Sequence, residues 1–283
     1  MPMREIMVPY LSPHGFHKLA YFEWGDAANT NVMLCVHGLT RRGRDFDFLA
    51  QALERDYRVL CPDMPGRGKS DWLNDKNDYD YLTYVAAAAA LIARGGAASV
   101  DWVGTSMGGL IGMMVAAQPD SPIRKLVIND VGPFLPKAAL ERIGSYVGTD
   151  PRYDSLEALE KKLREDSASF GKLTDAQWHF LAEHYARLLP DGKWTPHYDP
   201  GIAVNIRKAM PAQDVALWPI WQQIRCPVLV LRGAQSDLLT AETAEKMKDR
   251  PYPTEIVTIA EVGHAPALLS EEQIEVIKRW FLQ

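Results

Sequence analysis

Cysteine is rare in this sequence, and long apolar runs and an excess of positive charge are absent. Only three of its 283 residues are cysteines, namely Cys35, Cys61 and Cys226. Their number is odd, their neighbours are apolar and their spacing fits no metal site, which argues against a disulfide framework or a cysteine-bound metal. We therefore expect reduced thiols in a cytoplasmic protein.

Neither a membrane nor a nucleic acid is an expected partner. The longest uninterrupted apolar run, Val85–Ala93, is too short to cross a bilayer. Residues 1–10 lack the apolar segment of a secretory signal. The net charge is −5, and the basic residues are scattered apart from Arg41, Arg42 and Arg44. We expect a small-molecule substrate and a monomer or homodimer.

Short apolar runs rich in β-branched residues alternate with helical patterns. The runs predicted as strands cover residues 18–25, 32–38, 57–63, 99–106, 125–132, 227–233 and 254–263. Several are apolar at successive positions, as in parallel strands covered on both faces. Helical patterns cover residues 44–54, 81–96, 107–119 and 271–281. This alternation predicts an α/β fold with a mostly parallel sheet flanked by helices.

The alternation stops once, between the runs that end at residue 132 and begin at residue 227. Residues 155–170 and 174–189 are amphipathic, and residues 189–201 are rich in turn formers. So long an interval between two strands of one sheet indicates an inserted unit. We expect a helical cap over residues 134–220 and a core domain made of residues 1–133 and 221–283.

Residues 104–108 read Gly-Thr-Ser-Met-Gly and match the G-x-S-x-G pattern of a nucleophile elbow. An apolar strand precedes the pattern and a helix follows it. Small residues two positions on either side of Ser106 allow strand and helix to pass closely, so that the turn presents the hydroxyl. Ser106 is therefore the candidate nucleophile. The alternative is a glycine-rich turn whose serine only caps the helix.

A serine nucleophile needs a base and an orienting carboxylate. His264 follows the last predicted strand and is the best base, because loops collect at the carboxyl edge of a parallel sheet. Asp237 follows the strand at 227–233 and is the favoured acid. Asp130 also ends a strand and is its rival, to be read otherwise as a helper or a turn former. His37 is expected to bond the backbone of its own loop.

The oxyanion of an acyl-transfer intermediate needs two amide donors. The backbone N–H of Leu39, after the strand at 32–38, and that of Met107, directly after the serine, are the candidates. The segment "GRGKS" resembles part of a phosphate loop, but the pattern needs glycine at position 63, where Asp63 stands.

These motifs resemble those of the α/β-hydrolase superfamily along essentially the whole chain. The matching segments are "HGLT", "DMPGRGKSD", "GTSMGG", "GAQSD" and "GHAP". The sequence is most similar to the capped bacterial branch that contains esterases, lactonases and carbon–carbon bond hydrolases. The resemblance implies an eight-stranded core and a helical cap after the sixth strand. A leucine follows "HG" without the extra glycines typical of many carbon–carbon hydrolases, which favours an ester substrate.

The predicted activity is that of a serine carboxylesterase acting through an acyl-enzyme on small or medium esters, without metal or organic cofactor. Haloalkane dehalogenases and epoxide hydrolases of this fold use an aspartate where Ser106 stands. A carbon–carbon hydrolase or a lactonase with the same triad is the alternative, and a non-catalytic pocket receptor is a third possibility.

Candidates for substrate binding lie just beyond the oxyanion loop (residues 36–40) and in the cap. They are Arg41, Arg42, Trp178, Tyr185 and Trp218. The arginines either bind a substrate carboxylate or form a solvated helix start. The aromatic residues either roof the pocket or hold the helices of the cap together.

Overall fold

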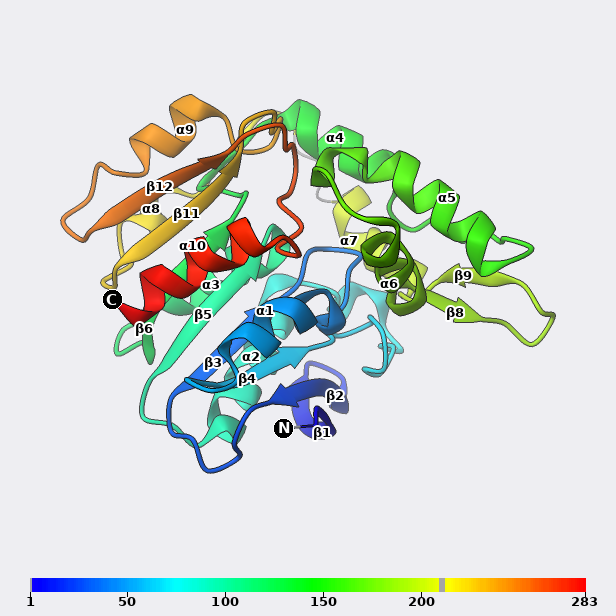
Figure 1. Ribbon diagram of the computed structural model, residues 1–283, viewed down its shortest axis with the longest axis horizontal. Coiled ribbons are helices and arrows are strands. Elements are labelled where there is room, and N and C mark those ends of the chain that lie inside the picture. The colour runs from blue at the N-terminus through cyan, green and yellow to red at the C-terminus, as the bar shows by residue number, and fades with distance from the viewer. Residues whose placement is uncertain (1, 209–211) are drawn as a thin grey trace.

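The computed structural model describes residues 2–208 and 212–283, so that residues 209–211 of the predicted cap lie outside the description. Its centre is an eight-stranded sheet in the order β1-β2-β4-β3-β5-β6-β11-β12 (Figure 1). The strands are β1 (Arg4–Ser12), β2 (Gly15–Trp24), β3 (Val32–Val36), β4 (Arg58–Pro62), β5 (Val100–Thr105), β6 (Ile123–Asn129), β11 (Val228–Gly233) and β12 (Thr254–Ile259). β2 is antiparallel to β1 and β4, and the other pairs are parallel. The predicted α/β fold with a mostly parallel sheet is confirmed.

The edge strand β1 is the one strand of this sheet that the apolar runs do not predict. Over Val8–Ser12 its residues alternate between buried and exposed, because one side packs on the core and the other faces solvent. A single-sided strand gives a weaker apolar signal than a central one such as β3, whose five residues are all buried.

Helices cover both faces of the sheet. On one face lie η1 (Gly43–Phe46), α1 (Asp47–Leu53) and α10 (Glu271–Leu282), which share one buried cluster with β3 and β11. On the other face lie α2 (Tyr81–Gly95), α3 (Met107–Ala116) and α8 (Trp218–Trp221), within a second cluster (Figure 1). The helix α9 (Ala241–Lys246) connects β11 to β12. No helix of the described residues is long and apolar enough to pass through a membrane.

Local signals fix the ends of these helices. The side chain of Asp80 caps α2 by accepting the Thr83 N–H, and α2 ends at Gly96 with φ +68°. Ser270 caps α10 by accepting the Gln273 N–H. Each cap satisfies one of the free amides of a first helical turn, so the boundaries predicted from the sequence fall close to those observed.

The segment predicted to form the cap follows the sixth strand and lies over the carboxyl edge of the sheet. It contains β7 (Phe134–Leu135), α4 (Lys137–Tyr146), α5 (Leu156–Asp166), η3 (Ala168–Phe170), α6 (Asp175–Tyr185), β8 (Ala186–Leu188), β9 (Trp194–Pro196), η4 (Pro200–Ile202), α7 (Ala203–Lys208) and β10 (Val215–Ala216). A third buried cluster, built around Leu159, Leu163 and Leu181, holds α5 and α6 together. The same cluster includes Leu269 of the core domain, so it also attaches these helices to the core.

The helix predicted over residues 174–189 is wrong at its end. The helix α6 stops at Tyr185, and Ala186–Leu188 form β8, which pairs antiparallel with β9. Pairing with a distant segment overrides the local helical pattern, since strand formation depends on context. The turn-rich residues between these strands close the hairpin at the far end of the cap (Figure 1).

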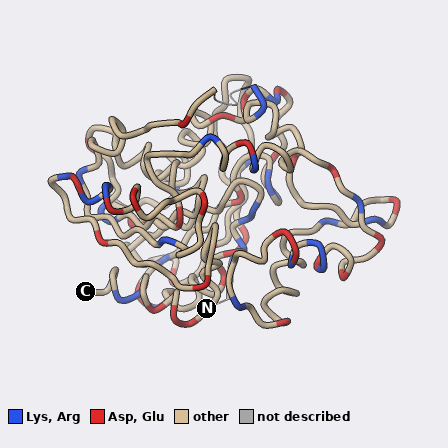
Figure 2. The backbone as a smooth tube through the Cα atoms, turned by 90° about the horizontal axis from the view of Figure 1, so that it is seen from above, with Lys and Arg blue, Asp and Glu red and all other residues tan. Residues whose placement is uncertain are grey.

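Charged residues of both signs are interspersed along the chain (Figure 2). Many pair within one helix, as Lys162 does with Asp166 at 2.5 Å. Such exposed pairs contribute little to stability, so the apolar clusters on the two faces of the sheet stabilise the fold.

The turn between β5 and α3 has almost no free space. A Cβ atom on Gly104 would lie 2.3 Å from the carbonyl oxygen of Gly108, and one on Gly108 would lie 2.0 Å from that of Val36. Both contacts are with backbone atoms, which cannot rotate away. The two glycines of the pattern are thus required by the close crossing of strand and helix.

We predict that Gly104→Ala lowers the free energy of unfolding by about 3 kcal/mol, since the new methyl group forces the backbone apart. Gly38→Ala is the matched control, because its nearest neighbour would lie at 3.8 Å, an ordinary contact. Urea denaturation of both variants measures the difference. Equal stability of the two variants would contradict the steric account of the elbow.

Candidate active site

Ser106 occupies the turn between β5 and α3 in a strained conformation, with φ 51° and ψ −113°. Its N–H donates to the carbonyl oxygen of Asn129 at 2.9 Å, and its side chain makes no capping bond to α3. The hydroxyl is therefore not used as a helix cap. Strain of this kind persists only where surrounding structure enforces it, and it is typical of functional sites.

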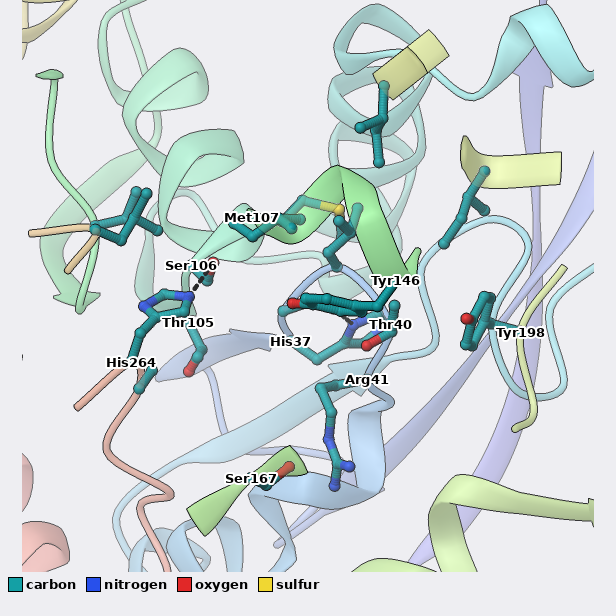
Figure 3. Close-up of a pocket in the computed structure, with 18 of the residues that line it drawn as sticks. His37, Thr40, Arg41, Thr105, Ser106, Met107, Tyr146, Ser167, Tyr198 and His264 are labelled. Carbon is teal, nitrogen blue, oxygen red and sulfur yellow. Dashed lines mark hydrogen bonds between the residues drawn. The ribbon is translucent and has the colours of Figure 1, made fainter. Parts of the chain in front are cut away.

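His264 lies in the loop after β12 and meets Ser106 at the carboxyl edge of the sheet. Its Nε2 is 2.9 Å from the Ser106 Oγ (Figure 3). Its Nδ1 is 2.8 Å from the Asp130 Oδ2. A proton on Nδ1, donated to that carboxylate, leaves Nε2 free to accept the serine proton. The structure thus brings together Ser106 and His264, as the sequence analysis predicts.

The carboxylate that faces His264 belongs to Asp130, and the expectation for Asp237 is wrong. Asp237 pairs instead with Arg142 of the cap, whose Nε and Nη2 lie 2.7 and 2.9 Å from its two oxygens. This pair is about half exposed, whereas Asp130 is fully buried. The bidentate guanidinium holds the Asp237 side chain away from the imidazole.

The strand order explains the position of Asp130. It directly follows β6, which lies between β5, carrying Ser106, and β11. Its backbone has φ +58°, and its Oδ1 accepts the Gly233 N–H at 2.8 Å. The second oxygen is thereby aimed at His264. The sequence does show that Asp130 directly follows the strand next to the elbow strand in the chain. Asp237 also follows a strand, however, and only the tertiary contacts show which of the two faces His264.

The two predicted oxyanion donors lie beside the serine. Met107 N–H is the first amide of α3, and Leu39 follows β3 in the adjacent loop; both residues line the same cavity as Ser106. Within the described ranges neither amide donates a hydrogen bond to another protein group. Two unused donors beside the hydroxyl are what an oxyanion site requires.

His37 holds the oxyanion loop, as predicted. Its Nδ1–H donates to the Gly38 carbonyl at 2.6 Å, and its Nε2 accepts the Met64 N–H at 2.9 Å. The second bond requires a neutral imidazole, because a protonated Nε2 could not accept it. The pKa of His37 falls from 6.5 to about 3, chiefly because the ring is buried; the bond to the Gly38 carbonyl opposes this shift, and the positive charges of Arg67, Arg41 and Arg42 add to it.

A cavity of about 1460 Å³ lies between cap and core and contains Ser106, His264 and the two oxyanion residues. Of the predicted substrate-binding residues, Tyr185 lines it, and so does Arg41, which Figure 3 labels. Arg42, Trp178 and Trp218 do not, so those three expectations are wrong. Its wall is formed largely by apolar and aromatic side chains of both parts, as in small-molecule sites.

The two tryptophans that do not line the cavity have structural roles. Trp178 is 7% exposed within the core of the cap and stacks on Phe170 at 6.4 Å between ring centroids. Trp218 packs on the core at the start of α8, with the Lys246 ammonium 4.7 Å from its ring. Aromatic content alone does not separate residues that face a cavity from those that hold helices together.

Both arginines of the oxyanion loop already have partners. Arg41 donates to both carboxylate oxygens of Asp45 at 2.6 and 2.8 Å and lies against the Tyr185 ring at 5.0 Å. Arg42 is buried and bonds Asp63 and the backbone of His184. Neither is a solvated helix start, and the carboxylates of Asp45 and Asp63 already occupy part of each guanidinium.

Two residues that the sequence analysis did not single out hold the His264 loop. The buried Asn129 donates from Nδ2 to the Pro266 carbonyl at 2.8 Å. Ser169, in the cap, donates from Oγ to the His264 carbonyl at 2.9 Å and accepts the Gly263 N–H through its own carbonyl at 2.8 Å. The imidazole is thus positioned from the core and from the cap.

One cluster elsewhere has the residue types of a metal site. Ligand atoms of His14, Asp75 and Asp78 lie within 4.8 Å of one another, outside the cavity. His14 already bonds Asp78 at 2.9 Å, and this bond raises the pKa of His14. An ordinary ion pair accounts for the grouping.

We predict that His37 makes stability depend on pH. The unfolded chain binds a proton at His37 below pH 6.5, but the folded protein does not until about pH 3. Stability is therefore lost as the pH falls through this window, by about 2 kcal/mol between pH 7 and pH 5.

The comparison of wild type with His37→Gln measures this contribution in urea at both pH values, because all other titrating groups are common to both proteins. The variant should lose about 2 kcal/mol less than the wild type over the same interval. A parallel loss in the two proteins would show that His37 is not held neutral.

Comparisons with known proteins agree with this fold. A family model described as the alpha/beta hydrolase family matches residues 33–278. The chain is 50% identical over 283 residues to a 3-hydroxybutyrate-oligomer hydrolase of Cupriavidus necator, covering 97% of this chain and 96% of that protein.

Solved structures give the same result. One from Rickettsia typhi has a TM-score of 0.92 and 33% identity, covering 100% of this chain and 99% of the other. An alpha/beta hydrolase from Novosphingobium aromaticivorans has a TM-score of 0.86 and 37% identity, covering 97% of each chain. With a matching family model over most of its length, the chain belongs to the alpha/beta hydrolase family.

Proposed function

We propose that this hydrolase is a serine esterase that cleaves short oligoesters of hydroxy acids. The observation that carries the proposal is the hydrogen-bond chain from Asp130 through His264 to Ser106, which ends in the cavity. A buried carboxylate, an imidazole and a hydroxyl in this order are the parts of a nucleophilic acyl-transfer site.

The first half of the reaction forms an acyl-enzyme. His264 Nε2 takes the proton of Ser106 as Oγ attacks the ester carbonyl carbon. The amides of Leu39 and Met107 donate to the oxygen that becomes negative. Asp130 stabilises the imidazolium that forms, and His264 then gives its proton to the departing alkoxide oxygen, so that the alcohol leaves.

The second half restores the enzyme. Water enters as the nucleophile, His264 accepts its proton, and the same two amides hold the second oxyanion. The carbon–oxygen bond to Ser106 breaks, Oγ takes the proton back, and the carboxylic acid is released. The side chains and amides named supply every proton transfer and charge contact of both halves.

Two observations support this substrate class, one from a relative and one from the cavity. The relative of 50% identity from Cupriavidus necator is named for hydrolysis of 3-hydroxybutyrate oligomers. A cavity of about 1460 Å³ exceeds the range of roughly 300–1,000 Å³ that is usual for small-molecule sites. It has room for several hydroxy acid units. We further propose that residues 134–220 act as a lid over the core of residues 1–133 and 221–283.

The carbon–carbon hydrolase alternative is the weaker candidate. It was motivated by the aromatic residues of the cap and by arginines able to bind a substrate acid group, and Arg41 and Arg42 are paired with Asp45 and Asp63. An ester needs no such group.

We predict that Asp130→Asn lowers kcat by about 10⁴-fold, because an amide in place of the carboxylate favours the wrong imidazole tautomer. Asp237→Asn, at the exposed pair with Arg142, should stay within about threefold of wild type. Steady-state hydrolysis of p-nitrophenyl butyrate measures both. A loss in Asp237→Asn as large as that in Asp130→Asn would contradict the assignment.

We predict that the protein converts the dimer and trimer of 3-hydroxybutyrate to monomer, and that Ser106→Ala lowers this rate by about 10⁴-fold or more. Ser145→Ala is the matched control, because that hydroxyl is exposed and bonds only its own helix. Chromatography of the products gives the rates. A wild type that leaves the oligomers intact while it cleaves simple esters would rule out the substrate class and keep the mechanism.

A further inference from the structure

A guanidinium group lies buried beneath the two oxyanion donors. Arg67, in the loop after β4, is fully buried, although arginine is rarely so unless it is paired. Its Nε donates to the carbonyl oxygen of Leu39 at 2.8 Å.

The other nitrogens of Arg67 contact the rest of the site's support. Nη1 donates to the Pro65 carbonyl at 2.6 Å and to the Tyr84 hydroxyl at 2.8 Å. Nη2 lies 3.5 Å from the sulfur of Met107. Arg67 therefore contacts both residues whose amides form the oxyanion site, Leu39 through its carbonyl oxygen and Met107 through its side chain.

These contacts complete the fixation of the oxyanion loop. The Gly38 carbonyl accepts from His37 Nδ1 and from the Arg41 N–H at 3.1 Å. Because a trans peptide directs its C=O and N–H to opposite sides, this fixes the direction of the Leu39 N–H. Arg67 fixes the next peptide group, between Leu39 and Thr40, by donating to the Leu39 carbonyl. The peptide groups before and after Leu39 are therefore both held.

The charge of Arg67 is not cancelled by a bonded carboxylate. All of its hydrogen-bond partners within the described residues are carbonyls, a hydroxyl and a sulfur. Its neighbour Arg42, by contrast, is bonded to Asp63. A buried charge is costly to desolvate, and in such surroundings its field is weakly screened.

We propose that Arg67 is a positioning residue of the oxyanion hole, which holds the Leu39 amide in place from below and adds positive potential where the oxyanion forms. The proposal rests on the proposed serine esterase function. Since the oxyanion exists only after attack on the carbonyl, Arg67 should stabilise the transition state more than the bound substrate.

The experiment compares Arg67→Met and Arg67→Lys with the matched control Arg58→Met, which removes a guanidinium that bonds Glu23 and the Gly95 carbonyl and does not line the cavity. Turnover of p-nitrophenyl butyrate is expressed per active site, titrated with a fluorophosphonate, so that misfolded protein is not counted. Affinities are measured for a trifluoromethyl ketone, which forms a tetrahedral adduct with a serine, and for the matched methyl ketone, which binds largely without it.

For Arg67→Met we expect kcat to fall about 100-fold with KM within about threefold, as for the loss of one oxyanion donor. The trifluoromethyl ketone should lose affinity in proportion, and the methyl ketone should not. Arg67→Lys keeps the charge but lacks the planar guanidinium, whose three nitrogens contact Leu39, Pro65 and Met107 at once, so its loss should be about 10-fold. Arg58→Met, counted per active site, should stay within about threefold of wild type.

If Arg67 only stabilises the fold, both Arg67 variants will have fewer active sites, but the affinity ratio of the two ketones will stay as in wild type. That result would overturn the proposal. If Arg67→Met does not fold, the ratio in Arg67→Lys decides in the same way. A wild type that forms no adduct with either reagent would contradict the proposed function itself.

Discussion

The hydrogen bond between the buried Asp130 and His264 is the interaction on which the site depends. It selects the imidazole tautomer whose Nε2 faces Ser106, and it exists because β6 lies between β5 and β11 in the sheet. Strand order thus places the acid one strand away from the nucleophile, while the loop after β12 carries the histidine back to both. The Gly233 N–H, which bonds the second oxygen of Asp130, leaves the carboxylate little freedom to turn away.

Local sterics and apolar runs made much of this arrangement predictable. The elbow at Ser106 needs glycines at 104 and 108 because backbone atoms pass within contact distance, and that requirement is visible in the sequence. The central strands are buried on both faces, so their apolar residues are continuous. His264 was found because loops after parallel strands gather at one edge.

The features of the site that the sequence did not predict depend on contacts between distant segments. Asp130 and Asp237 both follow strands, and only the pairing of Asp237 with Arg142, 95 positions away, separates them. In the same way, Trp178 fills the core of the cap while Tyr185, on the same helix, lines the cavity. Burial and pairing are properties of the assembled fold, which a pattern along the chain does not contain.

In this site Asp130 holds the His264 proton on Nδ1. Proton NMR of protein with ¹⁵N-labelled histidine detects that proton directly. The account predicts a strongly downfield proton attached to Nδ1 of His264 that exchanges slowly with solvent, since its acceptor is buried. The signal should disappear in Asp130→Asn and persist in Asp237→Asn. A proton found on Nε2 in the resting protein, or an Nδ1 signal that survives the loss of the Asp130 carboxylate, would contradict the account.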